Sequence, residues 1–449
     1  MTQIMKITLV KSMLFLLLLT IGIAPMYGQG KPQPLTAKEK KEVVKSIGDL
    51  LNEHYIYEET ANKMAEAISA KLTNGDYDKI TDPVEFADLL GADLIAVSHD
   101  KHIRARVDPE WIMQTKETVS EADSLAFVKE QVGYAQMDNF GFKEVKILEG
   151  NVGYLNLTAF YDTEYGGETA AAAMTLLSNA SALIVDLRQN GGGSPAMIQL
   201  ISSYLFGPAP VHLNNFYTRS STEPNQTWTL PHITGKRSPD IPVYVLTSKR
   251  TFSAAEEFSY NLKNMERATL IGETTGGGAH PGGTMAATER FTIWIPTGRA
   301  ENPISKTNWE GTGVKPHIET PANEALDKAH MKAIEALMEK YKGGQMEEKL
   351  AWSLAGMKAK SNPITVSETV LKSYEGKYGQ RILSLENGKL FYQREGRGKY
   401  ELKAMTQDLF MIDEVPSFRL KILKEKGSVV ALEGLYNNGR TDKSMKDKR

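Results

Sequence analysis

Cysteine is absent from this sequence of 449 residues. Without it the chain forms no disulfide bond, carries no acyl group on an N-terminal cysteine and has no thiolate nucleophile. An excess of either charge is also lacking, because 53 lysines and arginines face 55 aspartates and glutamates, which gives a formal net charge of −2. This balance provides no broad basic field, so the composition argues against nucleic acid or an anionic membrane surface as the partner.

Long apolar runs are lacking except near the N-terminus. Lys6 and Lys11 precede the apolar residues 13–23 (MLFLLLLTIGI), and small or turn-favouring residues follow up to Gly28. The run is too short to span a bilayer comfortably, and its order is typical of a secretory signal peptide. We therefore expect residues 1–28 to direct export to the periplasm or the extracellular space, leaving no integral membrane segment after cleavage. An uncleaved N-terminal anchor is the alternative.

Residues 36–98 have the pattern of a small helical bundle. Apolar residues recur at helical spacing in three stretches, each with one apolar face. Thr36 followed by Glu39 is a capping box at the first helix, and Asp82 followed by Pro83 marks the start of the third.

Residues 99–341 alternate strands and helices, which predicts an α/β domain with a largely parallel sheet. A Gly-Gly pair and a Ser-Asn-Pro then mark residues 342–366 as a linker. Short strands separated by turn residues predict an antiparallel β module over residues 367–440. The expected elements of the α/β domain include strands at 152–157, 182–187, 243–247 and 268–272, and helices at 168–179, 253–264 and 323–341.

One candidate catalytic residue is Ser253, in the segment 241–258 (IPVYVLTSKRTFSAAEEF). A strand leads into a short turn and Ser253 opens a helix, where unpaired amides such as that of Ala254 stabilise a developing oxyanion. The alternative is that Ser253 is an ordinary helix cap. Glu256 and Glu257 are expected to act electrostatically on the first turn of this helix.

A second candidate segment is ALIVDLRQNGGGSP, in which a buried strand delivers Gly191, Gly192 and Gly193 at its carboxyl end. Ligands bind at that end in open α/β sheets, and glycine amides can approach a substrate closely. We expect Gly192 to be the second oxyanion donor, with Gly191 and Gly193 as alternatives. A phosphate-binding loop is not indicated, because the sequence has no G-x-x-x-x-G-K-[ST] motif.

Three blocks in order, DLRQNGGG, TFSAAEEF and IGETTGGGAHPGG, resemble the core of the tail-specific (C-terminal-processing) serine protease family. The resemblance extends from about residue 40 to about residue 340. It implies a crotonase- or ClpP-like αβ core and identifies Ser253 as the nucleophile.

The resemblance also bears on the general base. In the bacterial processing branch a lysine about 25 residues after the serine has this role, and a PDZ domain precedes the core. This sequence has Gly278 at that position and no evident room for a PDZ domain. It is more similar to the tricorn-core and retinoid-binding-protein branch, which uses a Ser–His–Glu arrangement.

Within that branch, His102 in VSHDKHI matches the family histidine, and an imidazole can accept a hydroxyl proton and return it to a leaving amine. His99 and His280 are the alternatives. Glu310 in NWEGTGVKPHI matches the family E-x-x-G-V-x-P block, where a glutamate orients the histidine.

These observations predict a secreted serine endopeptidase that acts on peptide or protein substrates through an acyl-enzyme. A non-catalytic lipid- or peptide-binding protein on the same scaffold is the first alternative. A crotonase-like acyl-CoA enzyme is the second, and export argues against it. We expect no cofactor and no metal, because there is no H-E-x-x-H motif and the pair His99 and His102 lacks an evident third ligand. The sequence does not indicate an oligomeric state.

Overall fold

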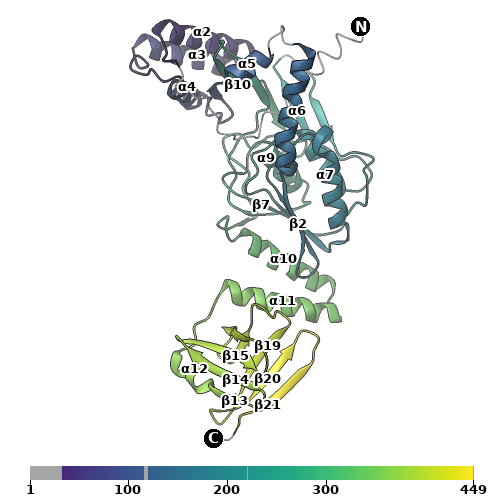
Figure 1. Ribbon diagram of the computed structural model, residues 1–449. Helices are drawn as coiled ribbons and strands as arrows, with labels where there is room; N and C mark the ends of the chain where they lie inside the picture. The colour runs from purple at the N-terminus through teal and green to yellow at the C-terminus, as the bar shows by residue number, and fades with distance from the viewer. Residues whose placement is uncertain (1–32, 116–119, 220, 448–449) are drawn as a thin grey trace. The chain divides into compact units, whose positions relative to one another are not determined.

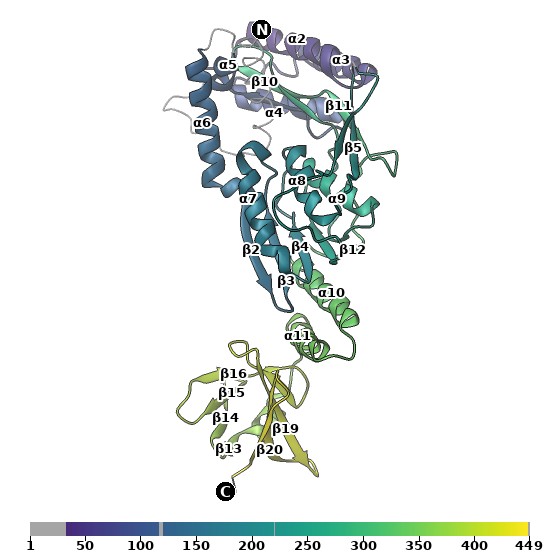
Figure 2. The ribbon, with the colours of Figure 1, turned by 90° about the vertical axis from the view of Figure 1, so that its right-hand side faces the viewer.

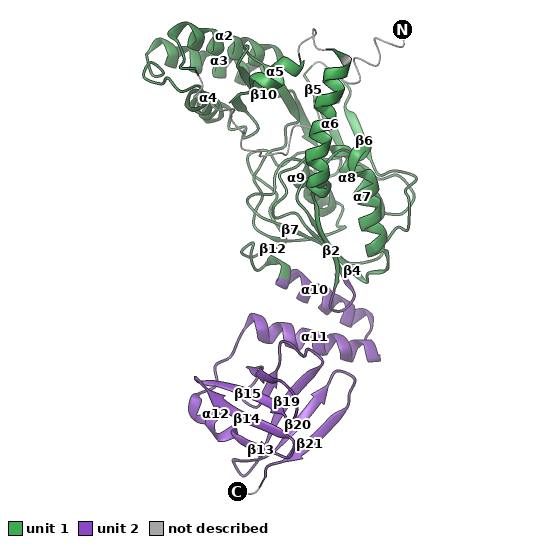
Figure 3. Cartoon of the chain, in the orientation of Figure 1, with its two compact units in different colours: residues 1–147, 153–326 green, residues 148–152, 327–449 purple. Residues whose placement is uncertain are grey.

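The computed structural model describes residues 33–115, 120–219 and 221–447 (Figure 1). The expected signal peptide, residues 1–28, lies outside these ranges. The chain divides into two compact units, one of residues 1–147 and 153–326 and the other of residues 148–152 and 327–449 (Figure 3). None of the helices in the described ranges is long and apolar enough to cross a membrane.

The first unit begins with three helices, α2 (Ala37–His54), α3 (Glu58–Thr73) and α4 (Pro83–Ser98). As predicted, Thr36 accepts a hydrogen bond from the amide of Glu39 (3.1 Å), and Asp82 caps α4. These helices share one core with the three-stranded sheet β1–β10–β9, in which Phe291 and Ile293 are buried (Figures 1 and 2). The strands are β1 (Arg104–Val107), β9 (Gly282–Ala286) and β10 (Phe291–Pro296). The predicted boundary at residue 98 is therefore wrong as a domain boundary, because the apolar helix faces pack on strands from much later in the chain.

A six-stranded sheet in the order β12–β8–β7–β4–β3–β2 forms the centre of the first unit. Its pairs β4–β7, β7–β8 and β8–β12 are parallel, and every residue of β4 and β7 is buried. The predicted α/β class is thereby confirmed. The strands are β2 (Phe142–Leu148), β3 (Val152–Leu157), β4 (Ala182–Asp186), β7 (Val243–Thr247), β8 (Thr269–Gly272) and β12 (Ile318–Glu319).

Three helices follow strands of this sheet: α7 (Thr163–Leu176), α8 (Pro195–Leu205) and α9 (Ala254–Asn264). The helix α7 begins five residues before the predicted start at residue 168, because the side chain of Asp162 caps it by accepting from the amide of Glu164 (3.0 Å). Two further helices, α5 (Pro109–Thr115) and α6 (Glu121–Met137), were not predicted. Of the described α6 side chains, only that of Ala135 is buried, so this helix has no apolar face for periodicity to detect.

The remaining elements of the first unit are short. A second three-stranded sheet has the order β11–β5–β6. Its strands are β5 (His212–Thr218), β6 (Asn225–Trp228) and β11 (Gly298–Glu301), and two 3₁₀ turns span Asn139–Gly141 and Leu177–Asn179.

The second unit contains α10 (Ala325–Lys340), α11 (Gln345–Ser361), α12 (Glu368–Tyr374) and two antiparallel sheets. The prediction of a linker over residues 342–366 is wrong, because α11 occupies most of it and buries Leu350 and Leu354. The glycine pair and the Ser-Asn-Pro flank this helix instead of extending through it. The strands are β13 (Gly376–Tyr378), β14 (Arg381–Glu386), β15 (Lys389–Arg394), β16 (Lys399–Glu401), β17 (Lys403–Ala404), β18 (Leu409–Met411), β19 (Phe418–Glu425), β20 (Ser428–Tyr436) and β21 (Thr441–Met445).

Candidate active site

Ser253 lies in a tight turn between β7 and α9. Its backbone has φ 54° and ψ −122°, a conformation that costs free energy in a residue with a side chain. The turn is held to the segment after β4, because the Thr251 hydroxyl donates to the Leu187 carbonyl (2.8 Å) and the Phe252 amide donates to the Asn190 carbonyl (3.1 Å). The surrounding structure therefore stabilises an unfavourable backbone at the one residue expected to be the nucleophile.

The glycine loop approaches this turn closely. A Cβ atom added to Gly192 would lie 2.7 Å from the Ser253 Cβ and 3.1 Å from the Ala254 nitrogen. Only a residue without a side chain leaves the space in front of the Ala254 amide open. Gly192 also has φ 113°, which favours glycine.

The expected oxyanion donors need one correction. The Gly192 amide already donates to the Asn190 side-chain carbonyl (2.8 Å), so in this structure it is not available to a substrate. By contrast, the amides of Gly193 and Ala254 donate to no other residue in the described ranges. The structure therefore favours Gly193, one of the alternatives, as the donor that accompanies Ala254. Gly192, which has no side chain, leaves open the space in front of the Ala254 amide.

His102 lies in the short segment between α4 and β1, where a hydrogen bond and two aromatic contacts fix its position. Helix α4 ends at His99, which has φ 59° and an exposed side chain. Three residues later, the His102 amide donates to the Asp100 carboxylate (3.0 Å). The His102 ring is buried, with 8% of the residue exposed, and lies between Phe252 and Trp294 at centroid distances of 4.6 and 5.0 Å. Of the two histidines in VSHDKHI, only His102 therefore faces the turn that holds Ser253.

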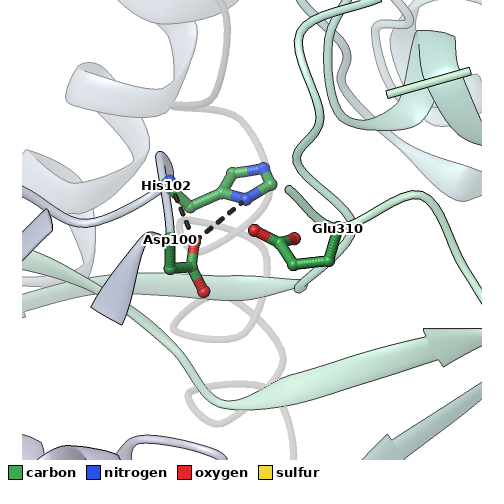
Figure 4. A group of neighbouring side chains, drawn as sticks. All are labelled: Asp100, His102 and Glu310. Atoms are coloured by element: carbon green, nitrogen blue, oxygen red, sulfur yellow. Dashed lines mark hydrogen bonds and ion pairs between the residues drawn. The ribbon is translucent and has the colours of Figure 1, made fainter. Parts of the chain in front are cut away.

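Two carboxylates, those of Asp100 and Glu310, gather on one side of His102 (Figure 4), and the imidazole of His280 contacts both of them. The His102 Nδ1 lies 3.7 Å from Asp100, whereas the other ring nitrogen points away from both carboxylates. His280 Nδ1 lies 2.7 Å from Asp100 and 3.6 Å from Glu310. Glu310 also accepts a hydrogen bond from the Ala279 amide. Glu310 thus reaches the histidine that it was predicted to orient, together with Asp100 and His280.

The pKa values of the two carboxyl groups in this cluster are shifted in opposite directions. Burial alone would raise the pKa of Asp100, but its interactions with His102 and His280 hold this pKa below the usual range. Burial and the charge of Asp100 raise the pKa of Glu310 instead. Burial and the same carboxylate also raise the pKa of Tyr55, whose hydroxyl donates to Asp100 (3.3 Å). Of the two carboxyl groups beside the imidazole, Asp100 is therefore the one whose ionised form the surrounding groups favour.

Ser253 directly follows Phe252, whose ring contacts the His102 imidazole at a centroid distance of 4.6 Å. Across the described ranges, no hydrogen bond joins the side chains of His102 and Ser253. Catalytic hydrogen bonds in substrate-free enzymes are often long and tighten only when substrate binds.

Two protein-family models match the parts of the chain that contain these residues. A model of the N-terminal domain of peptidase S41 in eukaryotic IRBP matches residues 35–138, and a model of peptidase family S41 matches residues 151–320. Together the two matches span more than half of the chain. The chain belongs to peptidase family S41. Asp100 and His102 lie in the first match, and Ser253, His280 and Glu310 lie in the second.

The S41 relatives include a carboxyl-terminal-processing protease of Synechocystis sp., which is 32% identical over 128 residues. That match covers 28% of this chain and 28% of the relative, so it spans little more than a quarter of the curated protein. A putative peptidase from Parabacteroides merdae has a TM-score of 0.43 and 19% identity, over 67% of this chain and 95% of that one. The photosystem II D1 C-terminal processing protease has a TM-score of 0.39 and 14% identity, over 64% and 94%.

Gly278 occupies the position that a lysine holds in the other S41 branch, and it lies against the histidine. A Cβ atom at Gly278 would be 2.6 Å from the His102 Cε1 and would also overlap the Phe252 ring. A lysine, or any other side chain, at this position would therefore displace His102 or Phe252. This steric exclusion accounts for the glycine in a chain that carries His102.

We expect the Gly278→Ala variant to lower kcat/KM by about 10²-fold, because a methyl group would shift the imidazole by about an ångström from its reactive position. Gly278 does not have a positive φ, so the substitution tests space and not backbone strain. Peptide hydrolysis would be measured beside Gly207→Ala, where an added Cβ meets no atom within 4 Å. Equal rates for the two variants would show that the contact with His102 does not matter.

Glu256 connects the turn of Ser253 to the glycine loop of residues 276–278. Its carboxylate accepts from the amides of Ser253 (3.0 Å), Gly277 (2.7 Å) and Gly278 (2.8 Å), and from the Thr275 hydroxyl. Burial raises the pKa of Glu256 to about 7, against the opposing effect of these donors. The expectation that Glu256 acts mainly on the first helical turn is therefore incomplete, because it also positions the loop that contacts His102.

Glu257, the next residue of α9, is buried near the side-chain amides of Asn214 and Asn261. Burial raises its pKa to about 8, and the two amides only partly oppose this. Between about pH 4.5 and 8 the unfolded chain releases the proton that the folded protein keeps. The free energy of unfolding therefore decreases with rising pH by up to about 1.4 kcal/mol per pH unit from this group.

The isosteric, neutral Glu257→Gln variant should lose that pH dependence. We expect its free energy of unfolding to rise relative to the wild type as the pH increases from about 5 to about 8. Urea unfolding of both proteins at several pH values measures the difference. A difference that is constant over this range would show that Glu257 is already ionised in the folded protein.

Sequence reasoning missed Asp100, Trp294 and the position of His280 beside His102. The signal for Asp100 was its spacing, since it stands two residues before His102 and binds that residue's amide. Trp294 and His280 reach the site from β10 and the loop before β9, and no local pattern connects either of them with His102. The sequence considered His99 and His102 as a metal-binding pair without an evident third ligand, whereas in the structure Asp100 and Glu310, and not His99, lie with His102 in a group that could hold a metal ion.

Proposed function

We propose that this chain is an exported serine endopeptidase that hydrolyses peptide bonds through an acyl-enzyme on Ser253, with His102 as general base. One observation carries the proposal. The strained turn that presents Ser253 lies against the glycine loop of residues 191–193, in which the Gly193 amide is free. Through Phe252 the same turn contacts the buried imidazole of His102. A nucleophile, an oxyanion site and a base are thus assembled in one unit of the chain.

Acylation follows from this arrangement. The Ser253 oxygen attacks the substrate carbonyl carbon, and its proton moves to the His102 Nε2, which points away from the carboxylates. The carbonyl oxygen becomes an oxyanion that accepts from the amides of Ala254 and Gly193. When the intermediate collapses, the C–N bond breaks, and the leaving amine takes the proton from His102. A water molecule then hydrolyses the ester by the same steps in reverse order.

The carboxylates stabilise the imidazolium that forms during both steps. Asp100 lies 3.7 Å from the His102 Nδ1, and Glu310 lies on the same side of the ring. Two carboxyl groups beside Nδ1, of which Asp100 is the more readily ionised, favour the charged ring and hold Nε2 towards the serine. Glu310 is the family-matched member of the pair, and Asp100 is an additional positioning residue.

The N-terminal residues and the relatives support the rest of the proposal. The order of charged, apolar and small residues in 1–28 supports export to the periplasm or the extracellular space. The Synechocystis relative is named a carboxyl-terminal-processing protease, which supports peptides or proteins as the substrate class. No cofactor enters this mechanism.

The proposal is tested by incubating the mature protein with a diverse peptide mixture and identifying products by mass spectrometry, with the Ser253→Ala variant as the control. New peptide termini that arise only with the wild type are the expected result, together with fluorophosphonate labelling of Ser253. A protein that binds peptides or lipids tightly yet yields no Ser253-dependent cleavage would instead be the non-catalytic alternative.

A further inference from the structure

We infer that the cluster of Asp100, His102 and Glu310 binds a divalent transition-metal ion such as Zn²⁺, and that this ion reversibly inhibits the enzyme. The binding site is independent of the proposed function. The inhibition rests on that function, because it assumes that His102 is the general base.

The spacing of the donor atoms suits a small metal ion. One ligand atom from each of the three side chains lies within 4.8 Å of the others. The His102 Nδ1 and the Asp100 Oδ1 are 3.7 Å apart, close to the separation of about 3.4 Å between two ligands of a tetrahedral zinc ion. Small side-chain rotations are therefore sufficient to close the site around an ion. One nitrogen and two carboxylate oxygens favour zinc over magnesium or calcium, which prefer oxygen ligands alone.

Two of the donor atoms are buried and have no hydrogen-bond partner within the described ranges. The His102 Nδ1 and the Glu310 Oε1 both lack a hydrogen bond, and His102 is only 8% exposed. Polar atoms in a protein interior are nearly always paired. Both atoms lie in the same cluster (Figure 4), so a single ion would satisfy both and neutralise the two carboxylates.

The imidazole of His280 contacts both carboxylates of the cluster. The His280 Nδ1 lies 2.7 Å from the Asp100 Oδ2, which leaves the Oδ1 of the same carboxylate facing His102. Metal-binding carboxylates are commonly oriented by such an outer hydrogen bond.

The consequence for catalysis follows from the two ring nitrogens. A neutral imidazole that binds a metal through Nδ1 carries its proton on Nε2. The Nε2 lone pair is then absent, so the ring cannot accept the Ser253 proton. Metal binding at Nδ1 therefore blocks the general base without touching the nucleophile, and removal of the ion restores it.

Binding is measured on the full mature chain carrying Ser253→Ala, so that the result does not depend on activity. Titration of ZnCl₂ in a calorimeter should show one ion bound per chain. Adding Glu310→Gln, or separately Asp100→Asn, should weaken the affinity by about 10- to 100-fold. Adding His99→Asn should leave it unchanged, because His99 is exposed and asparagine tolerates its left-handed backbone. Circular dichroism shows that each variant is folded.

The absence of stoichiometric binding, or binding that both cluster variants retain at full affinity, would overturn the site. In the wild type, Zn²⁺ should abolish peptide hydrolysis and a chelator should restore it. Zinc-dependent hydrolysis that survives Ser253→Ala would overturn the inhibitory role. If the ion binds as expected but the wild type cleaves no peptide, the site stands and the proposed peptidase function fails.

Discussion

Replacing Ser253 by alanine should lower kcat/KM for peptide hydrolysis by about 10⁴- to 10⁶-fold, the loss typical of removing a serine nucleophile. Without the hydroxyl no acyl-enzyme forms, and the amides of Ala254 and Gly193 stabilise only the slow attack of water. The substrate site is otherwise intact, so we expect substrate binding to change little. Initial rates with a quenched peptide, and the affinity of the variant for the same peptide, measure both quantities.

The matched control for this variant is Ser259→Ala in the same helix. The Ser259 hydroxyl is buried and donates only to the carbonyl of Ala255, four residues earlier (2.7 Å). Its loss removes one hydrogen bond of α9 without changing the turn at Ser253, so the rate should stay near that of the wild type. A Ser253→Ala variant that retains a rate similar to that of Ser259→Ala would rule out Ser253 as the nucleophile.

The His102→Ala variant should lose nearly as much activity, about 10⁴- to 10⁶-fold. Without the base, the Ser253 hydroxyl cannot lose its proton as it attacks, so the rate of fluorophosphonate labelling should fall as well. Because the two residues act as a unit, the double variant should be no slower than either single one. The losses would add fully if the residues acted independently.

His280 and His99 provide the comparison that identifies the base. The His280→Gln variant should keep most activity, because His280 contacts Asp100 and not the turn of Ser253. The His99→Asn variant should be unaffected, since His99 is exposed at the end of α4. A loss with His280→Gln as large as that with His102→Ala would transfer the role of base to His280.

Local sequence patterns predicted the elements that position the site. The β7 strand, the turn and the start of α9 were expected within one residue, because a buried apolar strand, a short polar turn and a helix start follow each other directly. The β4 strand, which leads into the glycine loop of residues 191–193, was also expected within one residue. By contrast, α6 and α11 were missed, since one buries a single described residue and the other is flanked by residues that indicate a loop.

The sequence by itself determined the α/β class and named Ser253, His102 and Glu310 as candidates, with Gly278 at the position where the resemblance implies a lysine in the other branch. These features depend on residues close together in the chain or on short blocks that resemble a family. Only the tertiary structure decided that the Gly192 amide is occupied by Asn190, and that Asp100 and His280 join Glu310 around the imidazole. The physical reason is that hydrogen bonds and electrostatic contacts depend on distance in space, and these partners come from loops that the fold alone brings together.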